Sequence, residues 1–323
     1  MRIAFASCIH TPVFRNQPVW DWIAARQPDH LVLLGDSLYL DLSLTGPHPE
    51  QMLDDEFARH LFARYTGLLA QPQLRALVQQ LPPGRVWSVW DDHDFLWNDA
   101  LGAEARANPQ HSGKLRLSTA FHEAFRRALA LGLAPGAFPS AYNDAVFWDM
   151  NQPPLATPSV ALQPGLWLHL SDCRSWRTRT WLLEESKRHL LGAAQRQRIG
   201  AAVAAQPQAL HLLACGSTLS SWKRRYPQDW AWLISLAAQH RTLVLSGDIH
   251  RNEVDANHTG GWPLHEATSS GAAVKDAVVF GQRRRNFGLL EIDAAQLQIT
   301  LLADNQVQPA LSRHLDRSTW LPV

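Results

Sequence analysis

The sequence has few cysteines, no excess of either charge and no long apolar run. Its three cysteines among 323 residues are too few, and odd in number, for a disulfide framework, so each is a buried thiol, a reactive thiol or a metal ligand. Thirty Lys and Arg against 29 Asp and Glu leave a formal charge of +1, which argues against a nucleic-acid groove and a polybasic membrane patch. No stretch approaches the roughly 18 apolar residues of a membrane-spanning helix.

Proline and glycine are present but not concentrated. The 20 Pro and 18 Gly are dispersed, which excludes collagen-like and low-complexity chains. With 46% hydrophobic residues the chain can bury a large core, and the absence of a repeat or linker predicts a single domain over residues 1–323. The apolar run Ile3–Ala6 is too short for a signal peptide, so we expect a cytoplasmic protein without a membrane partner. The sequence does not indicate an oligomeric state.

Short β-forming runs alternate with amphipathic stretches. The predicted strands are Ile3–Ala6, Leu31–Leu34, Val86–Trp90, Ala145–Trp148, Leu166–Leu170, Leu210–Ala214, Leu243–Leu245, Leu289–Ile292 and Ile299–Leu302. The predicted helices are Glu56–Leu69, Leu117–Leu131, Ala193–Ala205 and Asp229–Gln239. This alternation predicts an α/β layered fold with at least one mixed sheet. The last two strands predict an antiparallel hairpin that closes a sheet edge.

Five predicted strands end in side chains that can bind a metal or transfer a proton. In α/β proteins, the functional residues usually lie just past the carboxyl ends of the strands, so these strand ends are candidate site segments. Each alone is typical of a turn, a helix cap or a buried thiol, but their recurrence at five ends indicates a site. They read Ser7-Cys8-Ile9-His10, Gly35-Asp36-Ser37-Leu38-Tyr39, Asp91-Asp92-His93-Asp94, Ser171-Asp172-Cys173-Arg174 and Ser246-Gly247-Asp248-Ile249-His250.

The donor types at these ends suit a pair of metal ions. Asp36 follows a glycine on a tight turn, where two metals could share its carboxylate, and Tyr39 can reach the same place as a phenolate. Asp92 and His93 pair an oxygen ligand with an imidazole that can protonate a leaving oxygen. Two metals about 3.5–4 Å apart would polarise a phosphate and generate hydroxide near neutral pH. These ligands suit Fe, Mn or Zn, with Ca at an all-oxygen position.

Four of these segments resemble the motifs of the PhoD-type alkaline phosphatases, a branch of the calcineurin-like metallophosphoesterases. The segments are Ala6-Ser7-Cys8, Leu34-Gly35-Asp36-Ser37-Leu38-Tyr39, Trp90-Asp91-Asp92-His93-Asp94 and Ser246-Gly247-Asp248-Ile249-His250. The run from Ser171 to Arg177 resembles the Asp-x-Arg-x-x-Arg segment of that branch, and Ser217-Thr218 with Trp222 resembles its stretch before the last metal motif. The matches follow the family's order from residue 3 to about residue 275.

The resemblance implies a four-layer α/β/β/α sandwich with mixed sheets and a dinuclear centre at its edge. It implies that one metal, iron in this branch, is held by Cys8, Asp36, Tyr39 and His250. It implies that a second, divalent metal, often calcium, is held by Asp36, Asp92 and Asp248. Zn and Mn remain alternatives.

The resemblance also assigns roles in catalysis and substrate binding. His93, beside the ligand Asp92, would steady the transition state or protonate the leaving oxygen, and Arg174 and Arg177 could grip phosphate oxygens. Independently of the resemblance, Trp97 and Trp176 follow site motifs directly and could line a pocket for an apolar or ring-bearing phosphoester. One family feature is missing, because the region that holds a His ligand in the superfamily reads Ala214-Cys215-Gly216-Ser217.

These observations leave three hypotheses. The first is metal-dependent hydrolysis of a small phosphoester, a mono- or diester, by a hydroxide that two metals activate. The second is a non-catalytic phosphoester- or nucleotide-binding module that keeps the fold and part of the site. The third is a structural or interaction protein, in which the ligand-type residues are caps and ion pairs.

Overall fold

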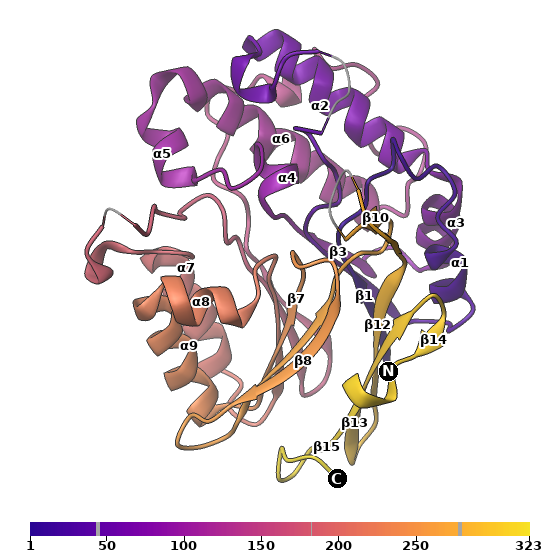
Figure 1. Ribbon diagram of the computed structural model, residues 1–323, viewed down its shortest axis with the longest axis vertical. Coiled ribbons are helices and arrows are strands. Elements are labelled where there is room, and N and C mark those ends of the chain that lie inside the picture. Colours follow the sequence, from indigo (N-terminus) through magenta and orange to yellow (C-terminus); the bar gives the residue numbers. More distant parts are fainter. Residues whose placement is uncertain (43–45, 182, 277–279) are drawn as a thin grey trace.

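The computed structural model describes residues 1–42, 46–181, 183–276 and 280–323, and it shows two large β-sheets with helices on both outer sides (Figure 1). The first sheet has the strand order β14-β13-β12-β1-β2-β3, and β15 also pairs with β13. Its strands are β1 (Arg2–Ala6), β2 (His30–Leu34), β3 (Val86–Val89), β12 (Asn286–Ile292), β13 (Gln296–Ala303), β14 (Gln306–Val307) and β15 (Arg313–Asp316). Strands β1, β2 and β3 are parallel, whereas β12 and β13 are antiparallel, so the sheet is mixed.

The second sheet has the order β4-β5-β6-β7-β9-β8. Its strands are β4 (Ser159–Gln163), β5 (Leu166–Leu170), β6 (Leu210–Ala214), β7 (Thr242–Ser246), β8 (Asn252–Asn257) and β9 (Leu264–Ser269). The inner strands β5, β6, β7 and β9 are parallel, and the edge strands β4 and β8 are antiparallel to their neighbours. A separate ribbon pairs β10 (Val274–Lys275) with β11 (Arg283–Arg284).

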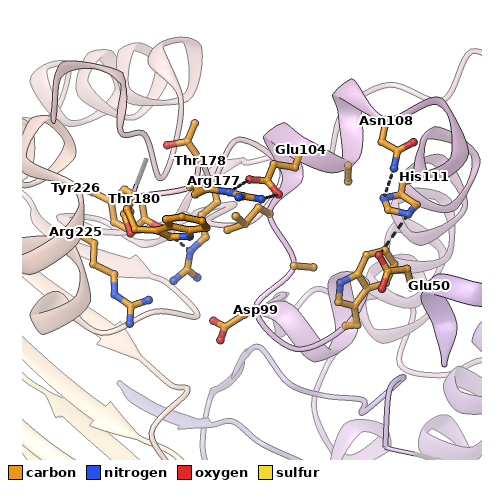
Figure 2. Close-up of a pocket in the computed structure, with 16 residues that line it drawn as sticks. Glu50, Asp99, Glu104, Asn108, His111, Arg177, Thr178, Thr180, Arg225 and Tyr226 are labelled. Atoms are coloured by element: carbon orange, nitrogen blue, oxygen red, sulfur yellow. Dashed lines mark hydrogen bonds and ion pairs between the residues drawn. The ribbon is translucent and has the colours of Figure 1, made fainter. Parts of the chain in front are cut away.

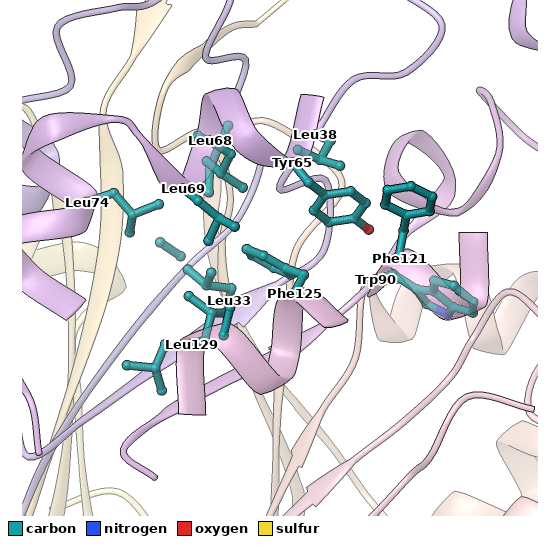
Figure 3. Close-up of a cluster of buried hydrophobic side chains, with 14 of the residues drawn as sticks. Leu33, Leu38, Tyr65, Leu68, Leu69, Leu74, Trp90, Phe121, Phe125 and Leu129 are labelled. Carbon is teal, nitrogen blue, oxygen red and sulfur yellow. The ribbon is translucent and has the colours of Figure 1, made fainter. Parts of the chain in front are cut away.

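The side chains of the strands alternate between two cores. In β1, Ile3 and Phe5 lie in the core between the two sheets, together with Leu168 and Leu245 of the second sheet. The alternate residues of β1 face the opposite way, into a core shared with the helices of the first half. Figure 3 shows part of this outer core, where Leu33 of β2 lies beside aromatic and aliphatic side chains from several helices.

The helices form the two outer layers. The first half of the chain contains α1 (Val19–Ala24), α2 (Asp54–Leu69), α3 (Pro72–Gln80), α4 (Asp92–Phe95), α5 (Gly102–Ala107) and α6 (Pro109–Ala130). The second sheet is covered by α7 (Ala193–Ala204), α8 (Leu219–Arg225) and α9 (Pro227–Gln239). Short 3₁₀ helices lie at Pro49–Gln51, Ala145–Phe147, Glu185–Lys187 and Pro309–Leu311. The expected α/β/β/α sandwich with mixed sheets is confirmed.

Two details of the predicted elements are wrong. Ala145–Trp148 is not a strand, because Asp144 caps a 3₁₀ turn there by accepting a hydrogen bond from the Val146 N–H at 3.1 Å. The hairpin of β12 and β13 does not close the sheet, because β13 also pairs with β14 and β15. Within the described residues, no helix is long and apolar enough to cross a membrane.

Candidate dinuclear metal site

The carboxyl ends of β1, β2, β3 and β7 meet at one edge of the sandwich. Three overlapping groups of metal-ligand side chains lie there, and within each group the donor atoms are all within 4.8 Å of one another. Asp36 belongs to all three groups. The groups are Cys8 with Asp36 and His250; Asp36 with Asp92 and His93; and Asp36 with Asp91, Asp92 and Asp248. Every candidate ligand from the sequence except Tyr39 is in this set, and Tyr39 contacts it directly.

The first group offers sulfur, oxygen and nitrogen donors. Cys8 Sγ lies 3.5 Å from Asp36 Oδ2. The Tyr39 hydroxyl lies 3.1 Å from His250 Nε2, and His250 Nδ1 lies 3.1 Å from the Asp276 carbonyl oxygen. Since that carbonyl can only accept, Nδ1 donates to it, and Nε2 is the ring atom that faces the Tyr39 hydroxyl. The first group can therefore hold a metal that accepts thiolate, phenolate, carboxylate and imidazole ligands.

The backbone at the site adopts an unusual conformation. The φ angles of Cys8, Asp36, Asp248 and His250 are 63°, 50°, 78° and 54°, in the left-handed region that non-glycine residues rarely occupy. Such residues cost free energy and gather at functional sites, where the surrounding structure holds them in place. Here the His250 N–H donates to Ser270 Oγ at 2.8 Å. This geometry turns the four side chains toward a common centre.

Gly247 lets the second sheet approach the first. A Cβ added at this position would lie 2.6 Å from Ser7 Oγ and 2.8 Å from the Leu34 carbonyl oxygen. Any side chain would therefore push the β7 end away from β1 and β2. The glycine places the donors Asp248 and His250 of one sheet against Asp36 of the other.

Burial of so many acids raises their pKa values. Burial, Cys8 and neighbouring carboxylates hold the pKa of Asp36 well above its usual range, and burial with Asp91 and Asp92 raises the pKa of Asp248 to about 7. For Asp92, burial is outweighed by Arg174 and His93, which lower its pKa to about 2. Among the described residues, the Asp91 Oδ2 atom is buried without a hydrogen-bond partner. A cation would lower these pKa values and satisfy this oxygen, so the residues fit a metal site.

His93 is oriented by Asp41, a residue that the sequence motifs did not identify. His93 Nδ1 lies 2.6 Å from Asp41 Oδ1, and Asp41 Oδ2 accepts a hydrogen bond from the Asn98 N–H at 2.8 Å. Burial would lower the pKa of His93, but the Asp41 bond with Asp36 and Asp92 raises it to about 10. The His93 bond in turn holds the pKa of Asp41 below its usual range despite burial. The neighbouring carboxylates thus favour the protonated form of His93, and its Nδ1 is engaged by Asp41.

The two predicted phosphate-binding arginines lie in different surroundings. Arg174 is 1% exposed, and its Nε donates to Asp91 Oδ1 at 2.5 Å while Nη2 lies 3.2 Å from Asp92 Oδ1. Its Nη1 has no hydrogen-bond partner among the described residues. Arg177 donates through Nε to the Tyr226 hydroxyl at 2.8 Å and lines a cavity beside the site. Both guanidinium groups thus lie next to the acidic cluster.

A cavity of about 690 Å³ lies beside the acidic cluster (Figure 2). Figure 2 shows Arg225 and Tyr226 on one side and Glu50 with His111 on the other, with Asp99 between them. The Asp99 N–H donates to Asp92 Oδ2 at 2.7 Å, which links the cavity to the metal-ligand group. Trp97 lines this cavity as expected, but Trp176 lines a different one of about 360 Å³.

Asp41 and Asp91 are the two residues of the site that the motifs did not single out. Asp91 was visible in the Asp91-Asp92-His93-Asp94 run, where it is the residue before α4 and its N–H donates to Asp94 Oδ1 at 2.6 Å. Asp41 lies five residues after Asp36 in a loop, and no local pattern brings it to His93. In the sequence, Asp41 is marked only by its carboxylate side chain, which could pair with the proposed acid His93.

The arrangement of two sheets with outer helices is similar to that of a solved structure. No family model matches the sequence, and no curated protein sequence matches it. The solved structure of PhoD superposes with a TM-score of 0.66 at 16% identity, covering 100% of this chain and 71% of PhoD. The PhoD-like fold that the motifs implied is thus confirmed.

Two further structures give weaker similarity. A predicted phosphoesterase from Streptococcus pneumoniae has a TM-score of 0.34 at 10% identity, covering 98% of this chain and 97% of its own. A Vps29 variant from Entamoeba histolytica has a TM-score of 0.33 at 11% identity, covering 98% and 99%. These scores are too low to support a conclusion. The comparison with PhoD shows the fold, and this fold brings the buried donors together at one sheet edge.

Proposed function

We propose that the chain hydrolyses a small phosphomonoester or phosphodiester at a site for two cations. The observation that supports this most is the position of Asp36, whose carboxylate belongs to every donor group at the sheet edge. In this proposal Cys8, Asp36, Tyr39 and His250 hold iron. Asp36, Asp92 and Asp248 hold a divalent cation, calcium or else Zn or Mn.

The protein groups around the cations bind the phosphate and move a proton. When bound, the cations supply Lewis acidity and lower the pKa of a water molecule. Arg177, and Arg174 through its unpartnered Nη1, bind the phosphate oxygens. His93 donates a proton from Nε2 to the leaving oxygen, while Asp41 holds Nδ1. Asp92 has two roles: it binds the divalent cation, and it stabilises the protonated form of His93.

The cavity beside the acidic cluster accommodates the alcohol part of the substrate. Trp97 and Tyr226 give it aromatic surface, and Arg177 connects it to the phosphate position. A substrate with an aromatic leaving group fits this lining. We further propose that residues 1–323 act as a single domain. The cytoplasmic location stays a prediction.

The proposal is tested by replacing the shared carboxylate. Asp36→Asn is expected to lose both bound metals and turnover of p-nitrophenyl phosphate and bis(p-nitrophenyl) phosphate, because it removes the one ligand that both positions share. Metal content per chain is measured by elemental analysis on protein purified without chelator.

Asp172→Asn is the matched control. Asp172 is 2% exposed and follows a strand of the second sheet, but it lies outside the donor groups. Its Oδ1 accepts from Trp90 Nε1 and from the N–H groups of Arg174 and Ser175, and asparagine keeps that oxygen. The control is expected to retain metal and turnover. Full activity in Asp36→Asn would refute the proposal.

The second hypothesis, a non-catalytic module, gives a different result in the same experiment. Wild-type protein would then hold stoichiometric metal and bind phosphate esters, but would release no alcohol with any added metal. The missing strand-end His is the observation that favours it. A purely structural protein would hold no stoichiometric metal at all.

A further inference from the structure

The end of β6 brings no metal ligand to the acidic cluster, and a glycine lies there instead. The residues after this strand are Cys215, Gly216 and Ser217. A Cβ added to Gly216 would lie 2.7 Å from Asp91 Cγ and 2.8 Å from Asp91 Oδ1. The absence of a side chain at residue 216 therefore makes the space that the Asp91 carboxyl group occupies.

Asp91 is buried, and only one of its carboxylate oxygens is used. Oδ1 accepts the short hydrogen bond from Arg174 Nε, and Cys173 Sγ lies 3.6 Å away. Oδ2 has no hydrogen-bond partner among the described residues, although Asp91 is 0% exposed. Burial of a carboxylate oxygen without a hydrogen bond destabilises a fold, and such an oxygen is uncommon in a native protein unless a ligand contacts it.

The surroundings of the Asp91 carboxyl group are strongly acidic. One donor atom each from Asp36, Asp91, Asp92 and Asp248 lies within 4.8 Å of the others. Arg174 is the guanidinium that pairs with this group, through Asp91 and Asp92. The basic side chains at this group, Arg174 and His93, are fewer than its four carboxylates, and a divalent cation would complement the excess negative charge.

We propose that Asp91 is the fourth carboxylate ligand of the second cation, in place of a side chain from the β6 end. This inference rests on the proposed function and extends it to the ligand set of that cation. With Asp36, Asp92 and Asp248, Asp91 makes an all-oxygen set, which selects a hard cation such as Ca²⁺ or Mn²⁺ over Zn²⁺. The loop after β3 then supplies two consecutive ligands, Asp91 and Asp92.

Asp91→Asn tests this role by cation binding rather than by turnover. Asparagine keeps the shape and one oxygen, so the fold is expected to persist while one negative charge is lost. Weakly held cations are first removed with a chelator, and the protein is then titrated with Ca²⁺ or Mn²⁺ in a calorimeter. The dissociation constant of the second cation is expected to be at least tenfold higher in Asp91→Asn than in wild type. Elemental analysis is expected to show the first metal retained.

Gly216→Ala is a second variant that leaves Asp91 in the sequence. The added methyl group would displace the carboxyl group, so the same weakening is expected. Asp172→Asn again serves as the control and is expected to bind both cations as wild type does. An Asp91→Asn protein that binds Ca²⁺ and Mn²⁺ with wild-type affinity would overturn the inference.

Arg174→Gln separates a ligand from a simple partner of Arg174. This variant removes the guanidinium that pairs with Asp91 but leaves the Asp91 carboxylate in place. If Asp91 is a ligand, the second cation is therefore expected to stay bound. If Asp91 serves only to orient Arg174, Arg174→Gln would reproduce the loss seen in Asp91→Asn, which would overturn the inference. Wild-type protein without any bound cation would instead refute the proposed function itself.

Discussion

His93 receives its orientation and its charge from Asp41. The bond between His93 Nδ1 and Asp41 Oδ1 is 2.6 Å long, and both side chains are at most 8% exposed. An ionised carboxylate can only accept, so Nδ1 must donate, and this fixes the orientation of the ring. Asp41 is thus a positioning residue for the proposed acid.

Removal of either member of this pair is expected to affect turnover through the same step. His93→Ala should lower kcat by about 10²–10⁴-fold with metals retained. Asp41→Asn should lower it by about 10–100-fold, because asparagine can still accept from Nδ1 but carries no charge. Steady-state kinetics of the single and double variants measure this, and the double variant should be no slower than His93→Ala.

The pH profile distinguishes positioning from a general structural effect. Since Asp41 raises the pKa of His93, Asp41→Asn lowers it. The protonated imidazole is then lost at lower pH, so the alkaline limb of kcat should move to lower pH. Independent, multiplicative effects of the two substitutions with an unmoved alkaline limb would contradict the coupling.

At the level of single residues, the sequence predicted the site residues that follow strand ends and missed Asp41, which lies in a loop. Cys8, Asp36, Tyr39, Asp248 and His250 each follow a strand, so their convergence follows from the parallel order of those strands. Asp41 reaches the site through a loop whose path depends on tertiary contacts, and no local spacing rule applies to it. The proposed roles of all these residues stay predictions.

At the level of elements, periodic segments were predictable and short irregular ones were not. The helices α2, α6, α7 and α9 were predicted within a few residues, with clear apolar stripes in α2 and α6, except that α6 begins eight residues before the predicted start. The edge strands β4 and β8 were missed, because they are half-exposed and carry polar residues. The helix α5 has six residues, too few for a periodic signal.

A buried carboxylate of α9 holds the segment at Leu190 and Leu191, just before α7. In the chain, this segment comes shortly after residues that line the cavity. Asp229 is 0% exposed and accepts hydrogen bonds from the N–H groups of Leu190 and Leu191 at 3.0 and 3.3 Å. Asp229→Ala leaves both buried donors unsatisfied, so we expect unfolding to become easier by about 1–3 kcal/mol. Urea denaturation measures this change.

Asp144→Ala is the control for this prediction. Asp144 is exposed and also accepts a backbone N–H, that of Val146, at 3.1 Å. Water can replace that bond, so the effect should stay within about 0.5 kcal/mol. Equal effects of the two substitutions would show that burial of the Asp229 contacts does not stabilise the segment.

At the level of the whole molecule, the stability of the sandwich should depend on the pH through Glu266. This carboxyl group on β9 is 6% exposed and accepts from the Leu219 N–H of α8 at 2.8 Å and from Ser246 Oγ of β7 at 2.7 Å. Burial raises its pKa from 4.5 to about 7, although the hydrogen bonds from Ser246 and Leu219 oppose this. The folded state therefore keeps a proton that the unfolded chain releases.

The sign of the effect follows from proton linkage. Below pH 4.5 both states are protonated, and between pH 4.5 and 7 only the unfolded state ionises, so the free energy of unfolding falls as the pH rises. The full loss is about 3 kcal/mol and is complete above pH 7. Glu266→Gln cannot ionise and should not show this loss. Urea denaturation of both proteins at equal metal content, at pH 5 and pH 8, measures the difference. Parallel pH curves for the two proteins would show that Glu266 is ionised within the fold, and that its two hydrogen bonds outweigh burial.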